Sequence, residues 1–250
     1  MIEITDILLC IAAGLFAGVL NTIAGSGSVV TLSLLSFLGL PVNIANGTNR
    51  IGLLFQSSAS SLKFYKQGEL KLHSKWFLIL STLLGTIGGV YVASILNIAS
   101  FEKIIGAIFL ALFFVVLLKP QRYLKESQTL SKLLPLIFLF IGFYAGFIQA
   151  GAGVFMLAVM HAVWGKSFTE LNPLKVFIIL CVNGIALLGY SLVGQVNWGF
   201  GLALAIGQIG GGLIGVRLNN LKNNIEPLVR ILLLVLILAS VAKFWNLYQI

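Results

Sequence analysis

The stretch NTIAGSGSVVTLSLLSFLGL, residues 21–40, decides the fold of this chain. An apolar run from Ile7 to Ala24 ends in it, the small residues Gly25 to Ser28 interrupt it, and a second apolar run follows from Val29 to Leu40. The second run is too short to cross a bilayer alone, because about 12 helical residues cover roughly 18 Å of a hydrocarbon core about 30 Å thick. The stretch therefore predicts a broken membrane helix followed by a short, re-entrant half-helix.

The composition indicates an integral membrane protein. Charged side chains make up 9% of the 250 residues and hydrophobic ones 59%, whereas about a quarter of an ordinary soluble domain is charged. A chain this apolar does not stay solvated as a disordered protein either. The net charge of +9 comes from basic residues spread over short loops, with no basic helix face, so we expect no nucleic-acid partner.

Apolar segments recur along the whole chain, and one polar stretch, residues 119–132, divides them. We predict an all-α fold with about eight to ten membrane segments, in which 1–118 and 133–250 form two repeats and 119–132 is a cytoplasmic linker. The expected segments are 7–24, 29–40, 44–62, 76–96 and 104–118, then 133–148, 154–164, 174–193, 198–216 and 228–242.

The two halves share spaced small residues in the same order. The matching motifs are GLFAG at 14–18 and GFYAG at 142–146, AGSG at 24–27 and AGAG at 150–153, and the Trp–Gly patterns of 76–89 and 198–211. We interpret them as an internal duplication. The alternative is coincidental glycine packing, which also favours spaced glycines in membrane helices.

The distribution of basic residues predicts that the repeats have opposite orientations. Loop 63–75, with four lysines, and the basic linker are expected in the cytoplasm, whereas the corresponding loop 194–197 has no charge. Loop 97–103 carries one lysine, and its counterpart 217–226 carries two basic residues. Inverted repeats of this kind recur in secondary transporters, and they place both chain ends outside.

Each half contains a Gly-rich break, NTIAGSGS at 21–28 and QAGAG at 149–153. Irregular backbone at membrane depth is tolerated only inside protein or beside a water-filled cavity. Each break precedes a short helix, whose first amides lack intrahelical partners and attract anions. We expect the breaks to meet and form an anion cradle; the alternative is that their glycines only allow close helix packing.

Arg50 and Lys175 lie within predicted spans, near their starts. A cation at this depth costs at least ~2.5 kcal/mol unless it is paired or reaches the headgroups. The carboxylates lie in loops or at chain ends, and of these Glu170 alone is within reach of Lys175. We predict that both cations bind an anionic substrate; the alternative is that they snorkel toward the headgroups.

Polar and small residues near the breaks and the cations complete the predicted substrate site. The alternative for each polar side chain is that it only forms a hydrogen bond that packs two helices together. The predicted substrate-binding residues are Asn21, Thr22, Gly25, Ser26, Gly27, Ser28, Thr48, Asn49, Arg50, Gln149, Gly151, Gly153, Asn172, Lys175 and Asn183. Cys10 and Cys181 lie in apolar runs without metal-ligand spacing. We expect no metal, cofactor or catalytic residue.

Four motifs of this sequence resemble the sulfite exporter TauE/SafE family of bacterial membrane proteins, also called DUF81 or TSUP. They are NTIAGSGSVVTLSLLSFLGLP, ANGTNRIGLL, GFYAGFIQAGAGVFML and SLVGQVNW, in order over essentially the whole chain. The resemblance implies an inner-membrane transporter of sulfite, thiosulfate or organosulfur anions. The family's Gly-Thr-Asn-Lys pattern falls on Gly47 to Arg50, with arginine replacing lysine; its Thr-Ser-Lys pattern falls on Pro173 to Lys175, where only the lysine is kept.

We therefore predict a secondary transporter or exporter of a small anion, sulfite or an organosulfur anion by the resemblance, that moves its substrate across a bacterial inner membrane by alternating access of the two repeats. A constitutive anion channel is the main alternative. A membrane-embedded enzyme is disfavoured because the sequence has no hydrolytic motif or paired carboxylates. A structural scaffold leaves the buried cations unexplained. The sequence leaves the oligomeric state open, a homo-oligomer included.

Overall fold

The computed structural model describes residues 3–23, 25–72, 75–118, 128–219 and 226–245. These residues form helices and loops, and no strand occurs among them, which confirms the predicted all-α class. The helices are α1 (Ile4–Ile23), α2 (Ser28–Phe37), α3 (Val42–Lys66), α4 (Trp76–Ile95), α5 (Ile98–Leu118), α6 (Gln128–Phe147), α7 (Ala152–Trp164), α8 (Phe168–Leu192), α9 (Trp198–Leu218) and α10 (Glu226–Phe244). Each corresponds to one predicted segment.

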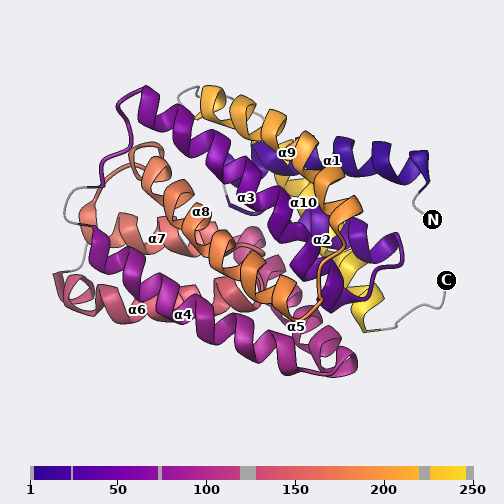
Figure 1. Ribbon diagram of the computed structural model, residues 1–250. Coiled ribbons are helices and arrows are strands. Elements are labelled where there is room, and N and C mark those ends of the chain that lie inside the picture. Colours follow the sequence, from indigo (N-terminus) through magenta and orange to yellow (C-terminus); the bar gives the residue numbers. More distant parts are fainter. Residues whose placement is uncertain (1–2, 24, 73–74, 119–127, 220–225, 246–250) are drawn as a thin grey trace.

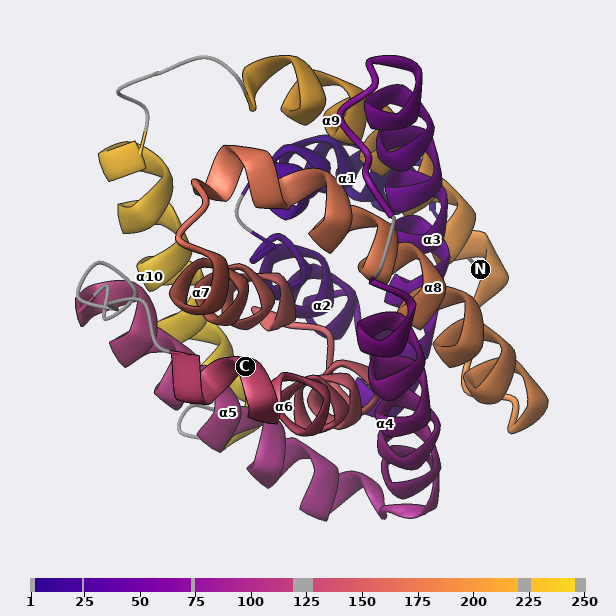
Figure 2. The ribbon, with the colours of Figure 1, turned by 90° about the vertical axis from the view of Figure 1, so that its left-hand side faces the viewer.

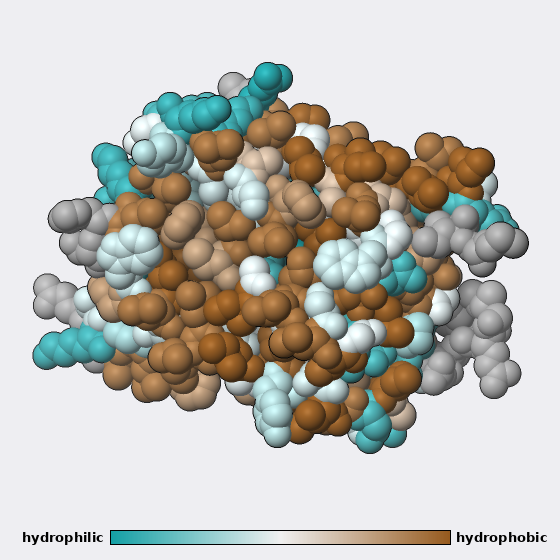
Figure 3. Space-filling model, in the orientation of Figure 1, coloured by the Kyte–Doolittle hydropathy of each residue, from teal (hydrophilic) through white to brown (hydrophobic). Residues whose placement is uncertain are grey.

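The helices have the lengths and surfaces of a bilayer protein. Within the described residues, α1, α4, α8 and α9 are long and apolar enough to cross a membrane. In contrast, α2 with 10 residues and α7 with 13 cover only about 15 to 20 Å. One face of α4 exposes Leu80, Leu84, Ile87 and Tyr91, each more than half accessible. Apolar side chains cover most of the face in Figure 3, and hydrophilic ones gather toward its left and right edges. Lipid is the environment that such a surface requires.

The first and fourth helices of the two halves pack in crossed pairs, α1 on α9 and α4 on α6 (Figure 1). Glycines bring the backbones together in both interfaces. A Cβ atom on Gly14 would lie 2.6 Å from Leu204 O, and one on Gly85 would collide with Leu139 O. The glycines on which the predicted repeat rests thus pack helices, and they do so at corresponding positions of the two halves.

The central helices α3 and α8 run antiparallel, and α2 and α7 lie inside the ring of longer helices (Figure 2). Near the start of α3, Asn46 Nδ2 donates to the Tyr190 hydroxyl at 2.9 Å, close to the end of α8. Near the end of α3, Phe64 packs on Val176, close to the start of α8. This arrangement brings residues of both halves to the middle of the bundle.

The α3–α4 and α8–α9 connections, which correspond in the two halves, lie at opposite ends of the bundle (Figure 1). At the start of α4, Lys75 Nζ lies 3.9 Å above the Trp164 ring; partial burial, together with nearby Lys166, lowers the pKa of this ammonium group. At the end of α4, Gln195 Nε2 donates to Ser94 O at 3.2 Å. Inverted repeats produce this placement, but the orientation of either loop in a membrane remains a prediction.

Helix α8 begins at Phe168 and not at the predicted residue 174. Ser167 caps it, because its hydroxyl accepts from the Glu170 amide at 3.3 Å and donates to the Glu170 carboxylate at 2.9 Å. Pro173 lacks the N–H that would bond the Thr169 carbonyl; this carbonyl accepts from Asn219 Nδ2 at 3.4 Å instead. Lys175 therefore lies two turns inside the helix.

The boundaries of the predicted linker also change. Residues 119–127 lie outside the described residues, and α6 begins at Gln128, so the last part of the predicted linker, residues 128–132, is helical. The cytoplasmic position of the linker and the division into repeats remain predictions.

Adjacent glycines on α4 test the crossed packing. We expect Gly89→Ala to lower stability by about 1 to 3 kcal/mol, because its methyl group would collide with Phe143 O. Gly88→Ala is the matched control, since the nearest side-chain atom would be 3.5 Å away. Thermal unfolding of the purified protein in detergent measures both, and equal midpoints would contradict the tight α4–α6 contact.

Candidate anion-binding site

The Gly-rich breaks of the two halves are in backbone contact. Gly25 and Gly151 have φ values of +79° and +75°, a left-handed conformation that glycine adopts without strain. A Cβ atom on Gly25 would lie 2.5 Å from Gly153 Cα, and one on Gly153 would lie 2.7 Å from Gly25 Cα. The breaks therefore meet, as the sequence predicts, although Ala24 of the first motif lies outside the described residues.

Groups within the breaks occupy several amides at the starts of the short helices. Asn21 Oδ1 accepts from the Ser28 amide at 3.1 Å and from the Ser28 hydroxyl at 3.4 Å, which ties the end of α1 to the start of α2. In the second break, the Ala152 amide donates to Gln149 O at 3.1 Å. The expectation that the first amides of both short helices are unpaired is wrong at five positions. The Asn21 side chain binds the Ser28 amide, and backbone carbonyls within the breaks accept from the amides of Val29, Val30, Ala152 and Val154.

Arg50 in α3 is fully buried, and its guanidinium group binds the end of α6. Nη1 donates to Ala145 O at 2.7 Å and to Gln149 Oε1 at 2.9 Å. Nη2 donates to Gly146 O at 3.1 Å. A longer contact of 3.5 Å joins Nη1 to Asn183 Oδ1 on α8. The cation of the first half thus lies at the break of the second half.

Lys175 in α8 makes the reciprocal contact with the end of α1. Its ammonium group is fully buried and donates to Asn21 O at 3.0 Å and to Thr22 O at 2.9 Å. Glu170, the carboxylate within reach in the sequence, is exposed and bonds Ser167 instead. The cation of the second half therefore lies at the break of the first half, with backbone carbonyls as its partners.

This crossed arrangement has an electrostatic cause. The last carbonyls of a helix have no intrahelical partner and carry partial negative charge, and hydrocarbon offers no water to bind them. Arg50 and Lys175 supply the missing donors, each for the other half. The snorkelling alternative does not describe these side chains, because both are 0% exposed.

Hydrogen-bond donors remain unused around the breaks. Asn21 Nδ2, Ser26 Oγ and Arg50 Nε are buried and have no hydrogen-bond partner. A lysine ammonium has three N–H groups, and the two carbonyls engage two of those of Lys175. Among the described residues no aspartate or glutamate is buried. This balance of donors and positive charge suits a ligand with anionic oxygen atoms.

Two predicted residues lie apart from the breaks. Thr48 Oγ1 accepts from the Asn197 amide at 2.8 Å, and Asn172 Nδ2 donates to Asn219 Oδ1 at 2.6 Å. Packing hydrogen bonds between helices, the alternative interpretation, describes these contacts. Asn49 Oδ1 accepts from Thr31 Oγ1 on α2 at 2.7 Å. The structure places the remaining predicted residues at the breaks or at the two cations: Asn21, Thr22, Gly25, Ser26, Gly27, Ser28, Gln149, Gly151, Gly153 and Asn183.

Sequence reasoning missed Asn46 and Tyr190, which hold Arg50 in place. Asn46 Oδ1 accepts from Arg50 Nη2 at 3.4 Å. The Tyr190 ring centroid lies 5.5 Å from Arg50 Cζ, and its hydroxyl bonds Gly146 O at 2.9 Å. Asn46 lies one turn before Arg50 on the same helix face, and this spacing in the sequence indicates that the two side chains are neighbours. No spacing in the sequence relates Tyr190 to a break.

Residues 10–244 match the family model described as Sulfite exporter TauE/SafE. The chain belongs to the TauE/SafE family. A "Probable membrane transporter protein" of Haemophilus influenzae is 28% identical over 236 residues, 92% of each chain. A Sinorhizobium protein described in the same words, with the suffix ORF9, is 26% identical and aligns over 92% of this chain and 90% of its own. No solved structure matches. The protein is thus a multi-pass membrane transporter of the TauE/SafE family.

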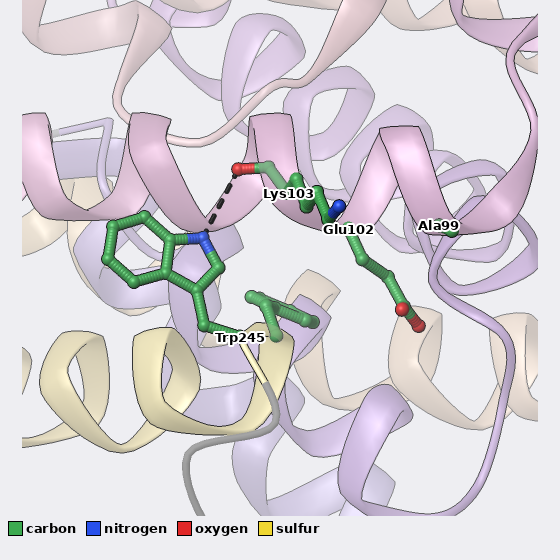
Figure 4. A pocket seen from close by; sticks show the side chains of 5 residues that line it. Ala99, Glu102, Lys103 and Trp245 are labelled. Atoms are coloured by element: carbon green, nitrogen blue, oxygen red, sulfur yellow. Dashed lines mark hydrogen bonds between the residues drawn. The ribbon is translucent and has the colours of Figure 1, made fainter.

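The candidate site is closed in this conformation, since Asn21 and Ser26 are at most 5% exposed. A surface pocket of about 420 Å³ lies elsewhere, between α5 and α10 (Figure 4). Its lining residues are Ala99, Glu102, Lys103, Phe244 and Trp245. The Trp245 indole donates to Lys103 O there at 3.3 Å. None of the predicted site residues lines this pocket.

The hydroxyl group of Tyr190 provides a test of how Arg50 is positioned. We expect Tyr190→Phe to lower stability by about 1 to 3 kcal/mol, because Asn46 Nδ2 and the carbonyl of Gly146 lose a buried partner. Tyr91→Phe is the control, since Tyr91 is 65% exposed. Thermal unfolding in detergent compares the two variants; a Tyr190→Phe midpoint equal to that of the control would contradict this role.

Proposed function

We propose that this protein is a secondary transporter that exports a small oxyanion, sulfite or an organosulfur anion, across a bacterial inner membrane. The two halves act as inverted repeats, and the substrate binds where their breaks meet. The description of the family and the membrane transporters among its relatives support transport over catalysis. The choice of anion rests on the charge and donors of the site.

The crossed position of Arg50 and Lys175 is the observation that carries this proposal. Each cation keeps a free donor after it has capped its carbonyls, Nε in Arg50 and one N–H in Lys175. An anion at the breaks can engage these donors without breaking the caps. Buried charged hydrogen bonds are stronger than neutral ones, so a small oxyanion gains more here than a neutral solute.

The closed site favours alternating access over a constitutive channel. A permanently open pore would expose its polar lining to water along its whole length. Here Arg50, Lys175 and Asn183 have no exposed surface. Transport therefore requires the helices around the breaks to move, and crossed interfaces between two halves support a rocking motion of one half against the other.

The membrane potential supports export as the direction. An inside-negative potential drives an anion outward with about 2.3 kcal/mol per charge per 100 mV. No carboxylate is buried among the described residues to act as an acidic proton carrier. Export needs no coupling ion under these conditions, whereas uptake against the potential would need one.

Flux through Arg50 variants tests the site. In proteoliposomes loaded with radiolabelled sulfite, we expect Arg50→Gln to reduce flux by about tenfold or more, because a buried charged hydrogen bond is worth about 1.5 to 3 kcal/mol. Arg50→Lys should keep more of the flux, since it retains the charge but not the fork of donors. Undiminished flux in Arg50→Gln would refute the anion site.

Lys66→Gln is the matched control for this experiment, because Lys66 is an exposed cation at the end of the same helix. Its flux should equal that of the wild type. Size-exclusion profiles and unfolding midpoints of all variants show whether a loss of flux reflects misfolding. A loss of equal size in Lys66→Gln would assign the effect to charge in general and count against a specific role of Arg50.

Cysteine labelling tests the inverted orientation. In a Cys10→Ser, Cys181→Ser background, we introduce Lys66→Cys and Val193→Cys, both at exposed positions near corresponding loops. A membrane-impermeant maleimide should label residue 193 from outside intact cells and residue 66 only after permeabilisation. Labelling of both from the same side would refute the inverted arrangement and leave the anion site untouched.

A further inference from the structure

Gln208 on α9 carries a buried amide that the packing of the helices leaves unused. The side chain has no exposed surface. Neither Nε2 nor Oε1 has a hydrogen-bond partner in the described part of the chain. Native proteins rarely bury an amide without partners, because each unpaired group loses its hydration. Such a side chain points to a ligand that is not part of the chain.

The amide of Gln208 lies between α9 and α3, on the face of α3 that points away from Arg50. A Cβ atom on Gly52, two residues beyond Arg50, would lie 2.5 Å from Gln208 Nε2. One turn further along α3, Gln56 Nε2 donates to Thr22 Oγ1 at 2.7 Å. Thr22 is also one of the two residues whose carbonyls bind the second cation. Uncharged polar groups thus continue from the breaks along α3 at its interface with α1 and α9.

The equivalent position in the other half shows that packing does not require this amide. Thr86 relates to Gln208 by the offset that relates Gly85 to Gly207. It is fully buried as well. Its hydroxyl has two carbonyl acceptors within reach, Thr82 O at 2.8 Å and Gly142 O at 3.3 Å, so its one donor is used within the protein. Only the α9 copy keeps an unused donor and an unused acceptor.

The chemistry of the amide selects a class of ligand. A glutamine side chain offers an N–H donor and a carbonyl acceptor at one place and carries no charge. A fully deprotonated oxyanion uses only the donor, whereas an oxyanion that retains one O–H group uses both. We propose that Gln208 binds the transported oxyanion in a protonated form, at a second position between α3 and α9, next to the polar groups that connect this interface to the first break. This inference rests on the proposed function.

Gln208→Met tests the proposal, because methionine has nearly the shape of glutamine without its polar groups. Radiolabelled sulfite flux into proteoliposomes is measured at mildly acidic pH, where sulfite carries a proton, and at mildly alkaline pH, where it does not. We expect KM to rise about tenfold at acidic pH, the effect of one lost hydrogen bond of ordinary buried strength, and to change little at alkaline pH. The unfolding midpoint should stay equal or rise, since the substitution removes an unpaired buried amide.

Thr86→Val is the matched control in the other half. It removes a hydroxyl that is already bonded, so its midpoint should fall while its KM for sulfite stays that of the wild type at both pH values. An unchanged KM in Gln208→Met, with a raised midpoint, would overturn the proposal and make the amide a packing defect. An equal rise of KM at both pH values would overturn the selection for a protonated form.

A second measurement tests binding at this position if Gln208→Met does not fold. In the Cys10→Ser, Cys181→Ser background, sulfite should slow the modification of Gln208→Cys by a small thiol reagent at acidic pH, and the absence of protection would count against binding at this position. The proposed function fails separately, because wild-type liposomes that move neither sulfite nor thiosulfate would contradict transport itself. Wild-type flux with normal Gln208→Met kinetics contradicts only the role of Gln208.

Discussion

The carbonyl groups at the ends of two interrupted helices impose the constraint on which this structure depends. Helices α1 and α6 both end inside the protein, where hydrocarbon and packed side chains exclude water. Lys175 binds the carbonyls of α1, and Arg50 binds those of α6. Each cap comes from the other half of the chain. The halves are therefore held together at the point where their breaks meet, and separating them would leave both charges and carbonyls unpaired.

The rest of the packing follows from this crossing. If each half caps the other, the first helix of one half must lie against the other half, and the pairs α1–α9 and α4–α6 satisfy this requirement. Glycines at the contact faces let the backbones approach closely, whereas the opposite face of α4 presents large apolar side chains to lipid. Helix α4 therefore has two different faces: small residues on one face allow close backbone packing, and large apolar residues on the other face contact the hydrocarbon of the bilayer.

The same cations give the site two properties that a transporter needs. Their bonds to carbonyls keep them folded inside the protein when no anion is bound, and their unused N–H groups leave capacity for a ligand. Some of the buried polar atoms without partners, Asn21 Nδ2 and Ser26 Oγ, lie where the backbone is interrupted, whereas others, such as the Gln208 amide, lie in a glycine interface. In the proposed mechanism, the closed site has to open by a conformational change before an anion can pass.

Composition and periodicity are local properties of the chain, so the features that depend on them could be predicted from the sequence alone. The membrane class, a helix for each apolar segment, the breaks at Gly25 and Gly151 and the position of Arg50 and Lys175 inside the membrane-spanning bundle could all be predicted. The partners of those cations could not, because a long side chain reaches whichever acceptor the opposite helix presents. Only the crossed tertiary packing decided that these acceptors are carbonyls of the other half, that Tyr190 and Asn46 hold Arg50, and that Gln208 is left unpaired.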